Sequence, residues 1–260
     1  MPEERTRPVV EDLGTVLGVW AHPDDEAYLS AGLMGALRDA GHRVVVATAT
    51  YGEQGTAEVS LPPDELAAVR EDEMRTSLAM VGVVEHRWLG YRDGACADAN
   101  GGVASVAQLI ADIQPDTILT FGPDGMTGHA DHRAVSAWTT AAWQQSGARA
   151  RLLYATLTPG FHEEWGALND RLGLWMYGSP PVTPDEQLAL YVVLTGADLD
   201  RKIGAVLAHV SQTTGLMTAV GAETFRRWWS AEAFVAADSL PDATELTVAE
   251  SEPEATGGAG

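Results

Sequence analysis

The chain has 260 residues, 45% of them apolar, and a formal net charge of −21. This composition permits a sizeable core in one or two domains. The acidic excess argues against nucleic acid or an anionic membrane as a partner and favours a small-molecule substrate. No apolar run approaches the roughly 18 residues that a membrane span requires.

The N-terminal segment and the cysteine content indicate the cellular location to be expected. Residues 1–12 are charged and contain no apolar run, so they predict no signal peptide. Cys96 is the only cysteine, which rules out an internal disulfide and fits a reducing compartment. We therefore expect a cytoplasmic protein, and the sequence leaves a homo-oligomer open.

Strand-like and helix-like segments alternate along the first 158 residues. The strands are expected at residues 16–21, 43–50, 86–90, 117–121 and 151–158. The helices are expected at residues 27–40, 63–80, 103–113 and 132–145. This alternation predicts an α/β fold with a Rossmann-like, mostly parallel sheet in the order 3-2-1-4-5, C-terminal additions and helices on both faces.

The remainder of the chain has a weaker pattern. Residues 160–187 are expected to be mostly loop, 189–194 to form a strand and 200–210 a helix. The end of the chain is acidic and rich in Gly, Ala and Thr, which is typical of disorder. We therefore divide the chain into an N-terminal extension (1–13), one domain (14–239) and a disordered acidic tail (240–260).

The sequence AHPDDE, residues 21–26, places one histidine and three carboxylates directly after the first expected strand. A second polar cluster, HADH, occupies residues 129–132 after the fourth expected strand. Strands one and four are neighbours in the order 3-2-1-4-5, and ligands of such sheets bind at the carboxyl ends of the strands. We therefore expect the two clusters to face each other.

Spacing within the clusters suits a metal. His22 and Asp25 are three residues apart, as are His129 and His132, so each pair points to one side of a turn or helix start. Histidine and carboxylate ligands suit Zn²⁺ or a similar divalent ion, and three protein ligands with an open position are typical of a catalytic site. Alternatively, either cluster alone would be a solvated turn, with Asp25 or Asp131 as a helix N-cap.

The two motifs together resemble the PIG-L/LmbE-like family of zinc-dependent de-N-acetylases, which includes deacetylases of N-acetylglucosaminyl conjugates and mycothiol-conjugate amidases. The resemblance extends over roughly residues 14–235. Its weaker matches are TYGEQG (50–55), VRE (69–71), LGYRDG (89–94) and KIGAVLAHVSQ (202–212). The chain departs from the family at Ala130, where proline is usual. It departs again at Thr127, where the mycothiol-pathway deacetylases have a tyrosine, which argues against a role in that pathway.

The resemblance implies a role for each residue of the two motifs. His22, Asp25 and His132 would ligate Zn²⁺, or Fe²⁺ or another divalent metal in its place. Asp24 would be the general base. His129 would stabilise the oxyanion, with its protonated form favoured by Asp131, or Asp131 would instead orient His132. The substrate would be a small N-acylated amino sugar or related conjugate, hydrolysed at its amide.

Residues outside the motifs have two interpretations each. Arg70 is expected to bind a substrate hydroxyl or phosphate, or else to lie on a helix surface. Asp93 is expected to bind sugar hydroxyls, or else to be a turn residue. Glu26 is expected to be structural or a helix N-terminal charge. His209 and Gln212 would close the pocket, with a structural role for His209 as the alternative. The tryptophans, including Trp165, Trp175, Trp228 and Trp229, would stack on a sugar or belong to the core.

Three other functions compete with a sugar deacetylase. A signalling receiver domain also has two acids after its first strand, but it needs an acceptor aspartate after strand three and a lysine after strand five. Asp93 and the only lysine, Lys202, come too late in the chain. The others are a metal-binding protein without turnover and an amidase acting on a thiol conjugate.

Overall fold

The computed structural model describes residues 10, 12–55, 61–175 and 180–239. The predicted acidic tail and most of the predicted N-terminal extension lie outside these residues. Seven strands form one sheet in the order β3-β2-β1-β4-β5-β7-β6. The strands are β1 (Val16–Trp20), β2 (Val44–Thr50), β3 (Glu85–Tyr91), β4 (Thr117–Phe121), β5 (Arg151–Ala155), β6 (Leu188–Val193) and β7 (Ala231–Ala236).

The predicted core of the fold is confirmed. Strands β3, β2, β1, β4 and β5 are parallel neighbours in the expected order. Their sequences explain this arrangement, because β1, β2 and β4 are buried along their whole length and are built largely from apolar and β-branched residues. Strand β7 pairs antiparallel with β5, and β6 pairs antiparallel with β7.

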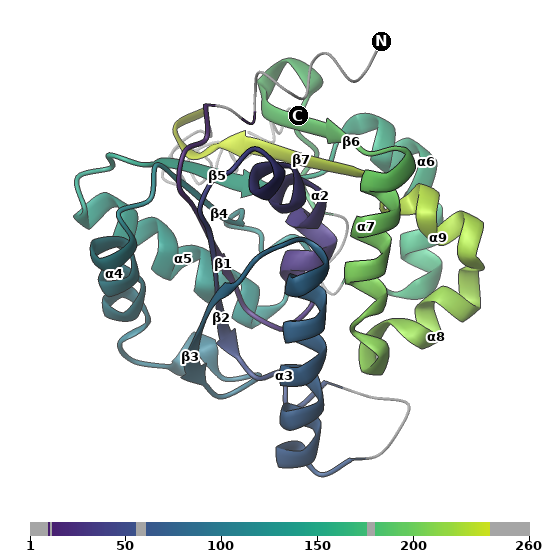
Figure 1. Ribbon diagram of the computed structural model, residues 1–260, viewed down its shortest axis with the longest axis horizontal. Helices are drawn as coiled ribbons and strands as arrows, with labels where there is room; N and C mark the ends of the chain where they lie inside the picture. Colours follow the sequence, from purple (N-terminus) through teal and green to yellow (C-terminus); the bar gives the residue numbers. More distant parts are fainter. Residues whose placement is uncertain (1–9, 11, 56–60, 176–179, 240–260) are drawn as a thin grey trace, which may run out of the picture.

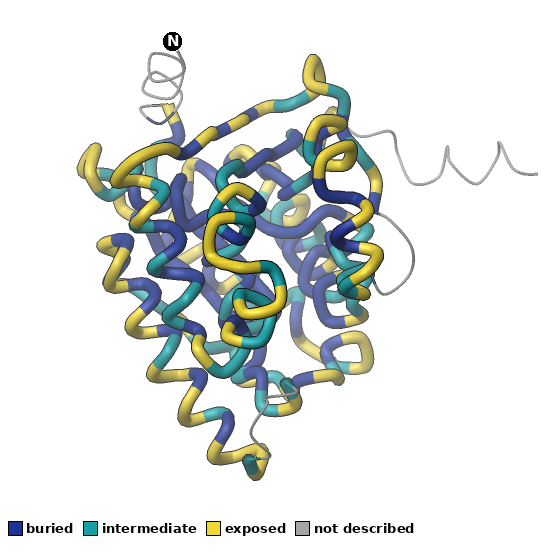
Figure 2. Tube along the Cα trace, turned by 90° about the vertical axis from the view of Figure 1, so that its right-hand side faces the viewer, coloured by how far each residue is buried: buried dark blue, intermediate teal, exposed yellow. Residues whose placement is uncertain are grey.

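Helices cover both faces of the sheet. They are α2 (Asp25–Asp39), α3 (Pro63–Met80), α4 (Gly102–Ile113), α5 (Ala130–Gln145), α6 (Pro159–Leu172), α7 (Gly196–Leu207), α8 (Val210–Val220) and α9 (Ala222–Trp228). Helices α4 and α5 lie on one side of the central strands, and α2, α3 and α7 lie on the other (Figure 1). The buried segments gather in the interior, whereas the outer helices alternate between buried and exposed residues (Figure 2).

The second half of the chain is more regular than its sequence indicates. Residues 160–187, expected to be mostly loop, contain α6, whose N-cap Thr158 accepts a hydrogen bond from the Phe161 N–H and is followed by Pro159. The expected helix at 200–210 is present as α7, which begins at Gly196 and ends at Leu207. Helices α8 and α9 and strand β7 were not predicted.

None of the described helices is by itself long and apolar enough to cross a membrane; α7 and α8 together reach the required length and composition but are bent by 118°.

A buried ion pair joins α2 to the C-terminal part of the sheet. Lys202 Nζ lies 2.8 Å from a Glu232 carboxylate oxygen, and neither side chain is exposed. Glu232 also accepts hydrogen bonds from the Gly32 and Leu33 N–H groups, each at 2.8 Å, while Lys202 donates to the Tyr28 carbonyl at 2.8 Å. The pair therefore satisfies polar groups of α2 in the middle of the helix.

We expect Lys202→Met to destabilise the protein by about 3–5 kcal/mol, because it leaves the Glu232 carboxylate buried without its cation. Urea unfolding of the purified variant measures this loss. The neighbouring Arg201→Met variant is the control: Arg201 pairs with the largely exposed Asp39, and such pairs contribute about 0–1 kcal/mol. Equal losses in the two variants would contradict a special role for the buried pair.

Candidate active site

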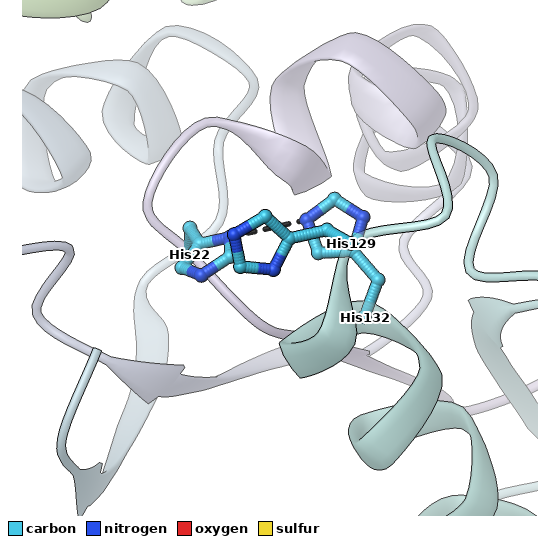
Figure 3. Close-up of side chains that lie close together, drawn as sticks. All are labelled: His22, His129 and His132. Carbon is cyan, nitrogen blue, oxygen red and sulfur yellow. Dashed lines mark hydrogen bonds between the residues drawn. The ribbon is translucent and has the colours of Figure 1, made fainter. Parts of the chain in front are cut away.

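The two polar clusters meet where β1 and β4 end. These strands are directly paired, with Gly18 opposite Leu119. The loop after β1 carries His22, and the segment after β4 leads into the start of α5, which carries His129 and His132. The rings of the three histidines lie together (Figure 3), and His22 Nδ1 is 3.1 Å from His132 Nε2. The expected juxtaposition of AHPDDE and HADH is thus present in the structure.

Asp25 completes a three-sided set of donor atoms. Its Oδ1 lies 3.4 Å from His132 Nε2, and its Oδ2 lies 3.7 Å from His22 Nδ1. Ligands placed 2.0–2.1 Å from a tetrahedral zinc ion are separated by about 3.4 Å. All three side chains are nearly buried, with 9–12% of their surface exposed. Their spacing and chemistry therefore fit a divalent metal.

Hydrogen bonds on the far side of each ring fix which nitrogen faces the donor set. His132 Nδ1 is 2.9 Å from the Gly125 carbonyl, which can only accept, so Nδ1 carries the proton and Nε2 presents a lone pair. His22 Nε2 lies 3.1 Å from Asp93 and 3.2 Å from Asp131, which leaves Nδ1 as the lone-pair nitrogen of the neutral ring. The lone pairs of His22 Nδ1 and His132 Nε2 and the Asp25 carboxylate converge, and such an arrangement is suited to binding a cation.

The carboxylates around His22 favour the protonated form of its ring. Burial lowers the pKa of His22, but the hydrogen bonds to Asp131 and Asp93 and the charge of Asp25 outweigh burial and raise this pKa to about 10. The pKa of His132 falls well below its usual value because the ring is buried and lies beside His22. Metal binding would therefore release a proton from this cluster.

Asp24 faces a different direction from its neighbour Asp25. It lines the main cavity, and its carboxylate lies 3.5 Å from the Arg70 guanidinium. Its backbone has φ 119°, an unusual conformation for a residue other than glycine and one that occurs mostly at functional sites. Burial, followed by the charge of Asp25, raises the pKa of Asp24 to about 6, although Arg70 opposes the shift.

The strained backbone at Asp24 is held by a buried pair. Glu26 Oε2 accepts a hydrogen bond from the Asp24 N–H at 3.1 Å, and Glu26 Oε1 lies 3.2 Å from His209 Nε2. Both side chains are fully buried. Glu26 and His209 thus have the structural roles that were among the expectations, whereas Gln212 lines the cavity. The partners are 183 positions apart, so the sequence shows no sign of this contact.

The expected contacts of Asp131 are wrong. Its carboxylate contacts neither His129 nor His132; it accepts hydrogen bonds from the Gly94 and Cys96 N–H groups at 2.7 and 2.9 Å and contacts His22 Nε2. The loop after β3 supplies these amides and draws the carboxylate toward His22. Asp131 is therefore placed to orient His22.

His129 is the N-cap of α5, and its Nδ1 accepts a hydrogen bond from the Asp131 N–H at 3.1 Å. Burial and the charge of His22 lower the pKa of His129, whereas the charge of Asp131 opposes this shift, as expected. With Nδ1 accepting, the neutral ring carries its proton on Nε2. His129 remains a hydrogen-bond donor without a positive charge.

Arg70 and Asp93 are more enclosed than expected. Arg70 is buried rather than on a helix surface, and it donates hydrogen bonds to the carbonyls of Gly52 and Pro23. Gly52 has φ +66°, and a Cβ atom there would lie 2.2 Å from the guanidinium, so only glycine fits. Arg70 lines the cavity, but its hydrogen bonds connect the loops after β1 and β2.

Asp93 is a buried partner of His22 rather than a simple turn residue. Its second oxygen accepts a hydrogen bond from the Gln54 N–H at 2.8 Å. Although burial opposes the shift, the hydrogen bond and charge of His22 lower the pKa of Asp93 to about 2. Asp93 and Asp131 therefore hold the same ring nitrogen from two sides. Neither sequence spacing nor residue type indicates this arrangement.

A cavity of about 590 Å³ opens at the donor set. Its walls include Asp24, His129 and Thr127, whose hydroxyl lies 3.3 Å from His132 Nδ1. Two of the four tryptophans considered above, Trp175 and Trp229, line the cavity, whereas Trp165 and Trp228 are buried together in a small apolar cluster. The cavity has the size of a small-molecule site and contains the site's unusual titratable groups.

Comparison with known proteins gives consistent matches. The family described as PIG-L, GlcNAc-PI de-N-acetylase, matches residues 17–143. The chain is 31% identical over 238 residues to a 1D-myo-inositol 2-acetamido-2-deoxy-alpha-D-glucopyranoside deacetylase of Acidothermus cellulolyticus, covering 76% of this chain and 79% of that protein. It is 30% identical to a protein of the same name from Actinosynnema mirum, covering 81% and 84%.

Solved structures share the fold. The N,N'-diacetylchitobiose deacetylase of Pyrococcus horikoshii aligns with a TM-score of 0.61 and 22% identity, covering 94% of this chain and 96% of that one. A teicoplanin deacetylase in its zinc-inhibited form aligns with a TM-score of 0.59 and 16% identity, covering 86% and 99%. The sequence matches show that this chain belongs to the PIG-L family.

Proposed function

We propose that the protein is a metal-dependent hydrolase that removes an acetyl or other acyl group from an N-acylated amino sugar or a related small conjugate. The observation that carries this proposal is the convergence of His22, Asp25 and His132 beside a cavity that Asp24 also lines. The names of the relatives, which are deacetylases of acetamido sugars, support the same reaction.

His22, Asp25 and His132 would hold the metal, which we propose to be Zn²⁺, with Fe²⁺ or another divalent ion as the alternative. When bound, the ion would polarise the amide carbonyl and acidify the attacking water. Asp93 and Asp131 keep the His22 lone pair directed at the site by holding its other nitrogen.

Asp24 would move the proton. It takes a proton from the water as the new C–O bond forms, and gives it to the nitrogen as the C–N bond breaks, which releases the carboxylate and the amine. His129, with its proton on Nε2, would donate a hydrogen bond to the oxygen on which negative charge develops. Arg70 and Glu26 hold the Asp24 loop in place during this transfer.

A signalling receiver domain is a poorer explanation. Its essential lysine would have to reach the two acids, but Lys202 is fully buried against Glu232 and does not line the cavity. A receiver domain would also not explain why His22 and His132 lie together.

The decisive experiment is a screen for release of the free acid from N-acetylglucosamine, its glycosides and other N-acylated sugars. It uses protein purified without a metal-binding tag and assayed before and after chelation, with metal content measured by elemental analysis. Release of acetate that requires the metal is expected. Absence of acid release from every compound, at one bound ion per chain, would overturn the proposal.

The rate should depend on pH through Asp24. A base acts only when deprotonated, so kcat/KM is expected to fall as the pH is lowered through about 6, the value to which burial and Asp25 raise the pKa of Asp24. A bound cation would lower this pKa, so the inflection lies at or below pH 6. The pH profile of the best substrate checks this expectation. An identical acidic limb in the residual activity of Asp24→Asn would contradict it.

A further inference from the structure

The cavity has two chemically different parts, and their boundary follows the sheet. One part consists of side chains from the loops after β1 to β4, from the first turns of α2 and α5, and from the helices α3 and α8. Its polar members are His22, Asp24, Asp25, Gln54, Arg70, Asp93, His129, His132 and Gln212. The proposed metal ligands, the proposed base and the proposed oxyanion donor are all in this part.

The other part lies over the β5, β7 and β6 half of the sheet. Among the described residues, its walls are formed mainly by six apolar side chains: Leu157, Phe161, Leu174, Trp175, Leu216 and Trp229. Five of them are only half-buried in the folded chain, so part of their apolar surface remains uncovered. The wall is supported by the buried cluster of Trp165, Leu168 and Trp228. The wall residues that pack against this cluster are Phe161, Leu174, Leu216 and Trp229.

Most polar side chains in this second part already have partners within the protein; the indole N–H groups of Trp175 and Trp229 are the exceptions, since both are buried without a partner among the described residues. Thr156 hydrogen-bonds Thr183 at 2.6 Å, and Thr158 accepts from the Phe161 N–H at 3.1 Å. The Glu232 carboxylate binds Lys202 and two α2 amides. Tyr191 is half-exposed. A sugar or polyol placed here would lose hydration and gain few hydrogen bonds.

Tyr28 connects the two parts. It follows Asp24 by one turn of α2, and its ring packs on Trp229 with a centroid distance of 4.5 Å. The ring of Tyr28 therefore lies between the proposed base, Asp24, and the apolar wall at Trp229. A substrate with its amide beside Asp24 would extend its remaining atoms along this wall.

From this arrangement we infer that the substrate carries an apolar alkyl or aryl group, which the wall formed by Leu157, Phe161, Leu174, Trp175, Leu216 and Trp229 binds next to the reacting amide. The inference rests on the proposed function and narrows its substrate class. The apolar group is either a long N-acyl chain or a substituent at the other end of the amino sugar, and the test separates these sources.

The test compares two substrate series on the metal-loaded full chain. One series holds the acetyl group constant in methyl, butyl and hexyl N-acetyl-β-D-glucosaminides; the other varies the acyl group of glucosamine from acetyl to hexanoyl. A fully buried methylene group favours binding about fourfold, which is ~0.8 kcal/mol, so kcat/KM should rise at least about tenfold along one series. No rise in either series would overturn the inference.

Variants test whether the preference for the longer alkyl or acyl group arises at the apolar wall. In Leu216→Gln and Leu174→Gln the preference for the hexyl or hexanoyl compound should shrink to below about threefold, because the wall becomes polar. Leu172→Gln is the matched control, since Leu172 packs against the same buried cluster but does not line the cavity. Thermal melting of all three variants confirms that they fold. Equal loss of preference in Leu172→Gln would contradict the assignment.

Binding without turnover separates this inference from the proposed function. Hexyl β-D-glucoside has no amide, and its binding can be followed through tryptophan fluorescence, because Trp175 and Trp229 lie in the wall. Saturable binding that is at least about tenfold tighter than that of methyl β-D-glucoside, and weakened in Leu216→Gln, supports the inference even if no substrate is hydrolysed. Equal binding of the two glucosides overturns it even if acetate is released.

Discussion

Replacing Asp24 by asparagine is expected to lower kcat by roughly 10² to 10⁴-fold while the metal stays bound, the usual contribution of a positioned acid–base group. The amide of asparagine is nearly the same size as the carboxylate but cannot accept the proton. Asp24 makes no contact with His22 or His132, since its carboxylate faces Arg70 and the cavity. The substitution therefore removes the proposed base and leaves the metal ligands in place.

The measurement combines steady-state kinetics with metal analysis of the same preparation. Asp39→Asn is the matched control, because Asp39 is an exposed carboxylate at the other end of α2 and should leave kcat unchanged. A near wild-type kcat for Asp24→Asn with metal present would rule out the base assignment. Loss of metal from Asp24→Asn, but not from Asp25→Asn, would mean that the two neighbouring carboxylates have the opposite roles.

Replacing His132 by alanine is expected to reduce bound metal from about one ion per chain to below roughly one tenth and to abolish activity, because a proposed ligand is removed. Asp25→Asn should weaken metal binding less completely, with activity partly restored by added Zn²⁺. Asp131→Asn removes only a partner of His22, for which a 10- to 100-fold loss of metal affinity is expected. This gradation tests the ligand set and its supports separately.

Two further measurements distinguish binding from catalysis. A metal that binds only the folded chain raises its melting temperature, so chelation should lower the melting temperature of the wild type and leave that of His132→Ala unchanged. His129→Ala should retain the metal while kcat falls by about 10² to 10³-fold, the loss found when one oxyanion donor is removed. Full metal occupancy in His132→Ala would show that the ligand assignment is wrong.

The sequence was sufficient to predict the parallel half of the sheet and the meeting of its two polar clusters. Strands β1, β2 and β4 are built largely from apolar and β-branched residues, and their alternation with helices leaves few topologies to consider. Once β1 and β4 are neighbours, the segments after them must converge, so His22 and His132 could be placed together from the chain order alone.

The sequence was insufficient for short elements and for distant partners. Helix α6 was not predicted, although Thr158 as N-cap and Pro159 at the first helical position are typical signals of a helix start. The place of strand β7 between β5 and β6 depends on antiparallel pairing that no local pattern specifies.

What the sequence determined by itself is the set of reactive residue types and the edge of the sheet at which they gather. Only the tertiary structure decided their individual positions. Asp93 and Asp131 both turn to His22, because the loop after β3 supplies the Gly94 and Cys96 amides that hold Asp131 there. Arg70 is buried, and its guanidinium donates hydrogen bonds to the Gly52 and Pro23 carbonyls. Such contacts join residues far apart in the chain, and they follow from the packing of whole elements rather than from local pattern.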